Sequence, residues 1–106
     1  NYEFNWLEET IKAARKISIL PNFGIFGTST AAIWLDSELQ KKAQYFVDED
    51  PSRINQVIFG RPVLHTKNVP ENGQVFMAMV PNQANKITER LALNNTTYHL
   101  PPLLRF

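Results

Sequence analysis

Hydrophobic positions along the 106-residue chain change repeatedly between helical spacing and short continuous runs. Apolar residues recur every three or four positions over residues 6–16, which predicts a first helix with one buried face. Continuous apolar runs follow at residues 23–26 and 45–47, as is typical of parallel strands that are covered on both faces. Between these runs, an apolar stripe that starts at Ala32 predicts a second helix, with Asp36 on its solvent-exposed face.

The second half of the chain continues this alternation. Asp50 precedes a proline, which predicts a short helical turn, and residues 61–64 are expected to form a brief edge strand. The strongest remaining strand signal covers residues 74–80, and a helix capped by Asn82 should follow it. Residues 97–100 are the last predicted strand.

Strands that alternate with helices pair in parallel through right-handed crossovers. We therefore predict an α/β fold, a Rossmann-like open parallel sheet with strand order 3-2-1-4-5 and helices on both faces. Residues 1–106 should form a single domain. Because the chain starts at Asn1 without a methionine and enters a helical pattern almost at once, we expect it to be a piece of a larger protein.

Composition narrows the classes of partner. Eleven basic residues against ten acidic ones give a net charge of +1, which provides no field for attracting nucleic acid or an anionic membrane. No apolar run approaches the roughly 20 residues of a membrane span. The absence of cysteine excludes disulfides and cysteine-ligated zinc and fits a reducing compartment, so we expect a cytoplasmic protein without nucleic-acid or membrane partners.

The turn after the first strand occupies the position of the G-x-G-x-x-G/A motif of dinucleotide-binding folds. Gly27 is the first glycine and Ala32 suits the third position, but Ser29 replaces the second glycine and obstructs close approach of a pyrophosphate. The hydroxyls of Thr28, Ser29 and Thr30 above a helix N-terminus are still suited to one phosphate or carboxylate. Alternatively, Gly27 only makes a tight turn and Ser29 only caps the helix.

Asp48 lies about twenty residues after this turn, where such folds keep an acid for ribose hydroxyls. Glu49 and Asp50 beside it make this edge repulsive to phosphate. Arg53 and Arg61 flank the same loop and are expected to pair with these acids, although either could reach an anion.

Ligands of open parallel sheets bind where the strand order reverses. In the predicted order, this point places Asn82 and Gln83 opposite Thr28 and Ser29. Neutral hydrogen-bonding side chains of this kind suit a sugar or nucleotide better than acid-base catalysis. Helix capping is the alternative role of Asn82.

Motifs for catalysis are missing from the sequence. His65 and His99 have no neighbours at metal-ligand spacing and are expected at the surface or at a sheet edge, so we predict no metal site. No serine lies in a nucleophile elbow, and no P-loop lysine follows the glycine turn. Four aromatic residues fall on helical or strand periodicity and are expected in the core, not in a stacking platform: Trp6, Phe23, Phe26 and Trp34.

Three segments together resemble a known family: IFGTSTAAIWLDSEL, YFVDEDPSRINQVIFGRPVL and VFMAMVPNQANKITERL. They look like the Rossmann-like domain that follows the catalytic domain in sugar C-methyltransferases. The resemblance covers residues 22–100. Its most specific part is a strand that ends in D-x-D-P, here from Asp48 to Pro51, followed by G-x-P-V, here from Gly60 to Val63.

This resemblance implies a C-terminal accessory domain that is not catalytic alone. The parent enzyme would take a methyl group from S-adenosylmethionine in an upstream domain, so no cofactor is expected here. A nucleotide-sugar could be held partly by this module. Family members often have glycine or lysine in the first turn, where this chain has hydroxyl residues. The candidate substrate-binding residues are Gly27, Thr28, Ser29, Thr30, Asp48, Asn82 and Gln83.

Two other classes of function stay open. One is a stand-alone nucleotide- or dinucleotide-binding enzyme domain that tolerates Ser29. The other is a structural module that forms a homodimer through the first helix and an apolar tail, which contains Leu103, Leu104 and Phe106.

Overall fold

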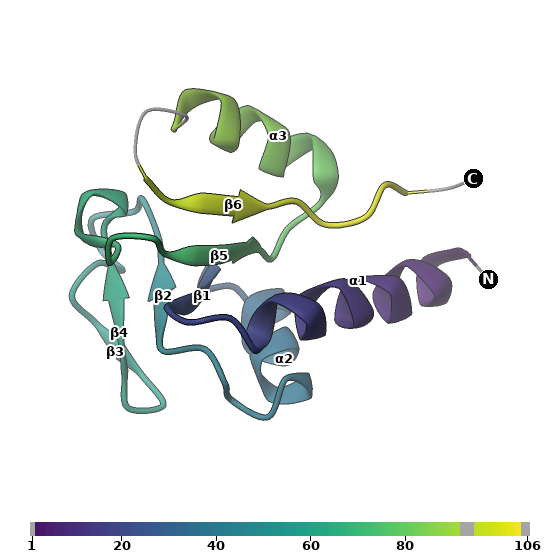
Figure 1. Ribbon diagram of the computed structural model, residues 1–106, viewed down its shortest axis with the longest axis horizontal. Coiled ribbons are helices and arrows are strands. Elements are labelled where there is room, and N and C mark those ends of the chain that lie inside the picture. Colours follow the sequence, from purple (N-terminus) through teal and green to yellow (C-terminus); the bar gives the residue numbers. More distant parts are fainter. Residues whose placement is uncertain (1, 92–94, 105–106) are drawn as a thin grey trace.

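A mostly parallel, open sheet of six strands forms the centre of the protein (Figure 1). The computed structural model describes residues 2–91 and 95–104, with the side chains from residue 5 onward. Within these ranges, no helix is both long enough and apolar enough to cross a membrane. The elements are α1 (Tyr2–Ser18), β1 (Phe23–Phe26), α2 (Thr30–Glu38), β2 (Tyr45–Val47), β3 (Val57–Ile58), β4 (Arg61–Leu64), the 3₁₀ helix η1 (Thr66–Asn68), β5 (Gln74–Met77), α3 (Pro81–Arg90) and β6 (Thr97–His99).

The strand order is β3-β4-β2-β1-β5-β6, so the predicted α/β class is confirmed and the predicted order is incomplete. The five predicted strands keep their relative order, but β3 adds an antiparallel edge outside β4. Residues 61–64 therefore do not form an edge strand. No apolar pattern signals β3, because it has two residues and Val57 is exposed. Its signal is the turn at Phe59 and Gly60, whose φ angles of 48° and 78° are typical of a type I′ hairpin.

The sheet carries one hydrophobic core on each face, because successive side chains of a strand point to opposite sides. α1 and α2 cover one face and α3 covers the other, as predicted (Figure 1). The core under α1 and α2 contains Ala14, Phe23, Ile25, Ala32, Leu35, Leu39, Phe46, Val63 and Phe76. The core under α3 contains Phe26, Tyr45, Val47, Val75, Met77 and Ala84.

A close contact between β1 and β2 depends on Gly24. Gly24 is paired with Tyr45, and a Cβ atom on the glycine would lie 2.2 Å from Cε2 of the tyrosine ring. The Tyr45 hydroxyl donates a 2.8 Å hydrogen bond to the carbonyl of Asn22. Burial, and to a lesser extent the neighbouring Tyr98, raises the pKa of Tyr45, so this donor stays protonated at neutral pH.

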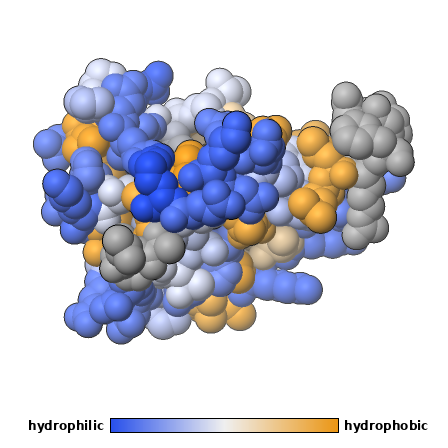
Figure 2. Space-filling model, turned by 90° about the horizontal axis from the view of Figure 1, so that it is seen from above, coloured by the Kyte–Doolittle hydropathy of each residue, from blue (hydrophilic) through white to orange (hydrophobic). Residues whose placement is uncertain are grey.

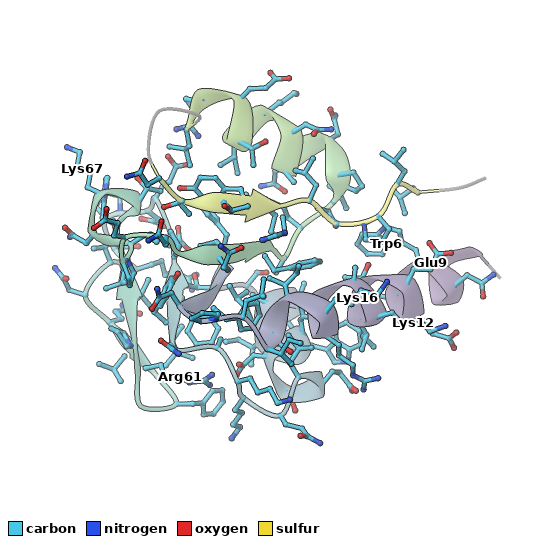
Figure 3. All side chains as sticks on the ribbon, viewed as in Figure 1. Trp6, Glu9, Lys12, Lys16, Arg61 and Lys67 are labelled. Atoms are coloured by element: carbon cyan, nitrogen blue, oxygen red, sulfur yellow. The ribbon has the colours of Figure 1, made fainter. Side chains whose placement is uncertain are left out.

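A buried ion pair joins α2 to β4. Asp36 is buried on α2, contrary to its predicted place on a solvent-exposed face. Arg61 donates two hydrogen bonds of 2.6 Å to the carboxylate oxygens of Asp36 and a third of 3.0 Å to the carbonyl of Ala43 (Figure 3). The expectation that Arg61 pairs with the acids after β2 is therefore wrong, because the guanidinium turns toward α2.

The short helical turn predicted after Asp50 is confirmed: the Ile54 N–H donates a 3.2 Å hydrogen bond to the Asp50 carbonyl, and the Asp50 side chain accepts hydrogen bonds from the backbone and hydroxyl of Ser52. The cap predicted for the next helix is wrong. α3 begins at Pro81 with Val80 in the cap position, so Asn82 does not cap it. Proline suits the first helical position because it has no N–H to satisfy there.

The segment after β6 runs along α1 (Figure 1). The Trp6 indole N–H donates a 2.7 Å hydrogen bond to the carbonyl of Pro102, and Pro101 is buried. Leu103 and Leu104 are exposed, and apolar side chains gather on this side of the molecule (Figure 2). Phe106, the last member of the predicted apolar tail, lies outside the described residues.

Candidate functional site

A cleft of about 400 Å³ opens where β1, β2 and β5 end. In the sheet, β1 lies between β2 and β5. The connection that leaves β1 leads to β2 on one side, whereas the later strand β5 lies on the other side, so the strand order reverses at β1. This is where open α/β sheets bind their ligands. The cleft is lined by Phe26, Gly27, Thr28, Ser29, Asp48, Glu49, Asp50, Arg53, Ala78, Met79, Gln83 and Ile87.

The turn between β1 and α2 forms one wall of the cleft. Gly27 has a φ of 120°, which a residue with a side chain adopts only under strain, and its N–H donates to the Val47 carbonyl at 2.8 Å. Ala32 is fully buried and lies close to Gly27, as the third position of the motif requires. Ser29 occupies the cap position of α2, but its hydroxyl makes no capping hydrogen bond. This hydroxyl is therefore available to a ligand.

Asp48 connects the ends of β1 and β2. One of its carboxylate oxygens accepts a 2.6 Å hydrogen bond from the Thr28 hydroxyl, and the other accepts a 2.9 Å bond from the N–H of Asp50. An ionised carboxylate has about four acceptor sites. These two bonds fix the carboxylate in the cleft wall and leave capacity for two more donors.

The remaining charges of the cleft are partly neutralised. Glu49 accepts hydrogen bonds of 2.6 and 2.7 Å from Arg90 of α3, and these bonds lower the pKa of Glu49. The N–H and hydroxyl of Ser52 likewise lower the pKa of Asp50. Arg53 lies 3.4 Å from the Thr28 hydroxyl and close enough to Asp50 to stabilise its charge. At neutral pH this end of the cleft is rich in carboxylates.

The structure brings together five of the seven candidate residues. Gly27, Thr28, Ser29, Asp48 and Gln83 all line the cleft, although they come from three separate loops or helix starts. The other two candidates, Thr30 and Asn82, are exposed and are not among its lining residues. In a helix, adjacent residues point about 100° apart, so one neighbour can face a cleft while the next faces solvent.

A second lobe of about 300 Å³ adjoins the first. Ser29, Ala78, Met79 and Gln83 line both lobes. The second lobe lies between the start of α1, the start of α2 and the end of β5. The residues that line it alone are mostly apolar: Trp6, Leu7, Thr10, Ala31, Trp34, Leu35 and Val80.

The sequence prediction for the aromatic residues was correct for two of them. Phe23 and Phe26 are buried in the core. Trp6 and Trp34 are only partly buried and form part of the second lobe. Periodicity placed both on apolar helical faces, but only the way that α1 packs on the sheet leaves part of those faces uncovered. No pattern in the sequence could have revealed this.

The two histidines lie away from the cleft. His65 is the cap residue of η1, where its Nδ1 accepts a 3.0 Å hydrogen bond from the Lys67 N–H. On the edge strand β6, His99 has its Nε2 2.7 Å from Oε1 of Gln74, and burial lowers its pKa. Over residues 2–91 and 95–104, no three histidine, aspartate or glutamate side chains are grouped as a metal site.

Comparisons with known proteins give no match. No protein-family model matches the chain, and neither a curated protein nor a solved structure does. The resemblance to the accessory domain of sugar C-methyltransferases therefore stays a prediction.

Proposed function

We propose that the chain is a Rossmann-like accessory domain that binds the sugar end of a nucleotide-sugar. The observation that carries the proposal is the fixed carboxylate of Asp48 in a cleft at the strand-order reversal. A carboxylate can accept hydrogen bonds from two sugar hydroxyls at once, and Asp48 has acceptor capacity left for two such bonds. The amide of Gln83 lies across the same cleft and makes no hydrogen bond within the described part of the chain.

The charge of the cleft supports a neutral ligand group at this end. Asp48, Glu49 and Asp50 line this end of the cleft and Arg53 is the one cation among its described lining residues, so a phosphate placed there would meet mostly like charge. The side chain of Ser29 stands where a dinucleotide site needs a second glycine. Both features favour a sugar over the pyrophosphate of NAD in this part of the cleft.

The wider context follows from the sequence resemblance. We propose that the parent protein is a cytoplasmic sugar C-methyltransferase whose upstream domain binds S-adenosylmethionine. In that arrangement the present domain would help to hold the substrate for the catalytic domain and would transfer no methyl group itself. The coding sequence upstream of Asn1 tests this part directly, because a methyltransferase domain must be encoded there.

Thermal unfolding with a panel of ligands tests the binding proposal. UDP-glucose should stabilise the chain by about 2.7 kcal/mol at 100 times its dissociation constant. Glucose 1-phosphate should also stabilise it, and S-adenosylmethionine and NAD, which carry a base but no sugar suited to the acidic end of the cleft, should stabilise it less than UDP-glucose does at the same concentration. Stabilisation by S-adenosylmethionine alone would refute the assignment of that cofactor to another domain, and stabilisation by NAD alone would favour the dinucleotide-binding enzyme.

Variants in the cleft locate the contact. Asp48→Asn should weaken binding of UDP-glucose by about 1.5–3 kcal/mol, because it replaces a charged acceptor of hydrogen bonds. Gln83→Ala should also weaken binding. Asn82→Ala is the matched control, since it removes an exposed amide from the adjacent position outside the cleft. Equal effects of the two amide variants would contradict the proposed location.

One observation favours the structural module as a second candidate. Leu103 is 70% exposed, and Leu104 beside it is 37% exposed. Burying large apolar side chains against a second copy would be favourable. Sedimentation equilibrium distinguishes the candidates: a dimer that is lost in Leu103→Ser, together with no response to any ligand, would support the structural module.

A further inference from the structure

We infer that the apolar second lobe binds the planar base of a nucleotide, so that one extended nucleotide-sugar would occupy both lobes. The inference rests on the proposed function for the position of the sugar, but it has independent support in the geometry of the lobe. Both tryptophans of the chain, Trp6 and Trp34, line it. Any of the nucleic-acid bases can stack on an aromatic side chain, because every base has a π face.

Trp6 is held in place by its indole N–H. This group donates a 2.7 Å hydrogen bond to the Pro102 carbonyl, so the ring lies between α1 and the segment after β6 (Figure 3). The Thr10 hydroxyl donates a 2.7 Å bond to the main-chain carbonyl of Trp6, within α1. A ring that is already fixed loses little conformational entropy when a ligand stacks on it, which favours binding.

Trp34 belongs to α2, whereas Trp6 belongs to α1. Trp34 packs partly against the core under α2, and Leu35 beside it is buried. The two indoles therefore belong to two helices that the sheet holds in position. With Leu7, Met79 and Val80, they give the lobe a mostly apolar lining in which a base can exchange contact with water for contact with side chains.

The residues shared by both lobes suit the part of the ligand between base and sugar. The Ser29 hydroxyl and the Gln83 amide line both lobes and have no hydrogen-bond partner within the described chain. Ser29 also stands at the N-terminus of α2, where backbone N–H groups favour negative charge. Phosphates would therefore lie here.

Charge also determines which end of the nucleotide-sugar lies in which lobe. The carboxylates of Asp48, Glu49 and Asp50 line the first lobe, and none of them lines the second lobe, to which both tryptophans belong. The neutral sugar suits the acidic end, and the base suits the aromatic end. The reverse direction would place a base among carboxylates and a hydroxyl-rich sugar against two indoles.

Intrinsic fluorescence reports on this lobe directly, because Trp6 and Trp34 are the two tryptophans of the chain. We expect UMP, dTMP or AMP to quench the emission as base and indole stack. Glucose 1-phosphate has no base and should leave the emission unchanged. UDP-glucose should quench and should bind more tightly than glucose 1-phosphate in calorimetry.

Two variants test the stacking faces one at a time. Trp6→Leu and Trp34→Leu keep apolar bulk, and each leaves a single indole as the reporter. Each should weaken nucleotide binding by about 5- to 150-fold, the equivalent of one base stack. Glucose 1-phosphate binding should not change. Phe59→Ala is the matched control, because it removes an exposed aromatic ring at the β3–β4 turn, which lines neither lobe.

Circular dichroism and thermal unfolding show whether each variant is folded. If a variant does not fold, the fluorescence titration of the unaltered chain still tests whether a base stacks in the second lobe. Absence of quenching by all three nucleotides would overturn the inference, as would equal affinity for UDP-glucose and glucose 1-phosphate. An apolar peptide segment that binds the lobe while nucleotides do not would overturn it as well.

The same experiment separates this inference from the proposed function. If glucose 1-phosphate binds and depends on Asp48 while no nucleotide quenches, the sugar site stands and the base site fails. If nucleotides quench but Asp48→Asn leaves the affinity for UDP-glucose unchanged, the base site stands and the proposed sugar site fails.

Discussion

Replacing Asp36 with alanine would leave the guanidinium of Arg61 without its counter-charge. The side chain of Asp36 is 1% exposed and that of Arg61 is 13% exposed, so water can replace few of the lost contacts. Two hydrogen bonds of 2.6 Å would disappear, and only the 3.0 Å bond to Ala43 would stay. Breaking a buried pair in this way costs about 3–5 kcal/mol. Since domains are stable by about 5–15 kcal/mol, the loss should be a large share of the total.

Arg61→Met removes the other partner. Methionine keeps apolar contact near the Phe46 ring, whose centroid lies 5.0 Å from the guanidinium carbon. The cost should again be about 3–5 kcal/mol, because the Asp36 carboxylate is then buried without a donor. The double variant Asp36→Leu, Arg61→Met removes both charges. We expect it to lose far less than the sum of the single variants, since apolar replacement of a buried pair is often close to neutral.

Urea unfolding, followed by tryptophan fluorescence and circular dichroism, measures these free energies. The pair of Glu49 and Arg90 provides a control with the same bidentate geometry at the surface, because their side chains are 34% and 56% exposed. Glu49→Gln should cost about 0.2–1 kcal/mol. If Asp36→Ala costs no more than Glu49→Gln, or if the effects of the single variants add in the double variant, the argument from burial is refuted.

Two further predictions concern the sheet. Gly24→Ala should reduce the free energy of unfolding by about 1–3 kcal/mol, because the new methyl group overlaps the Tyr45 ring; a loss below about 0.5 kcal/mol in urea unfolding would contradict the close contact. Burial lowers the pKa of His99 from its ordinary value of 6.5. At a pH below about 6.5, the unfolded chain therefore binds a proton at His99 more readily than the folded chain does. Stability should therefore fall as the pH drops below about 6.5, and His99→Gln should reduce this slope in urea unfolding between pH 5 and 8; an unchanged slope would show that His99 is not the cause.

Most of the sheet could be predicted because its signals are local. The runs at 23–26 and 45–47 coincide with β1 and β2, since a strand that is covered on both faces has to be apolar throughout. The crossover rule then gave the relative order of five strands. β3 could not be predicted in this way, because its two residues are defined by a backbone turn and not by burial.

The candidate site, like the sheet, could be predicted from the sequence only in part. Gly27 and Asp48 could be identified from sequence because their spacing is set by one strand, one helix and one more strand. Their hydrogen-bonded link through Thr28 agrees with that expectation. The pairing of Arg61 with Asp36 could not be predicted, since it depends on which way a long side chain turns between neighbouring elements.

The sequence by itself determined the alternating α/β pattern, the glycine turn and the acid after the second strand. Each of these follows from steric or hydrophobic preferences within a few residues. Only the tertiary structure decided that Gln83 lines the cleft while Asn82 does not, and that Trp6 and Trp34 form an apolar lobe next to the cleft that Asp48 lines. The physical reason is that a cleft is formed by elements from distant parts of the chain, and their packing decides which side chains face one another across it.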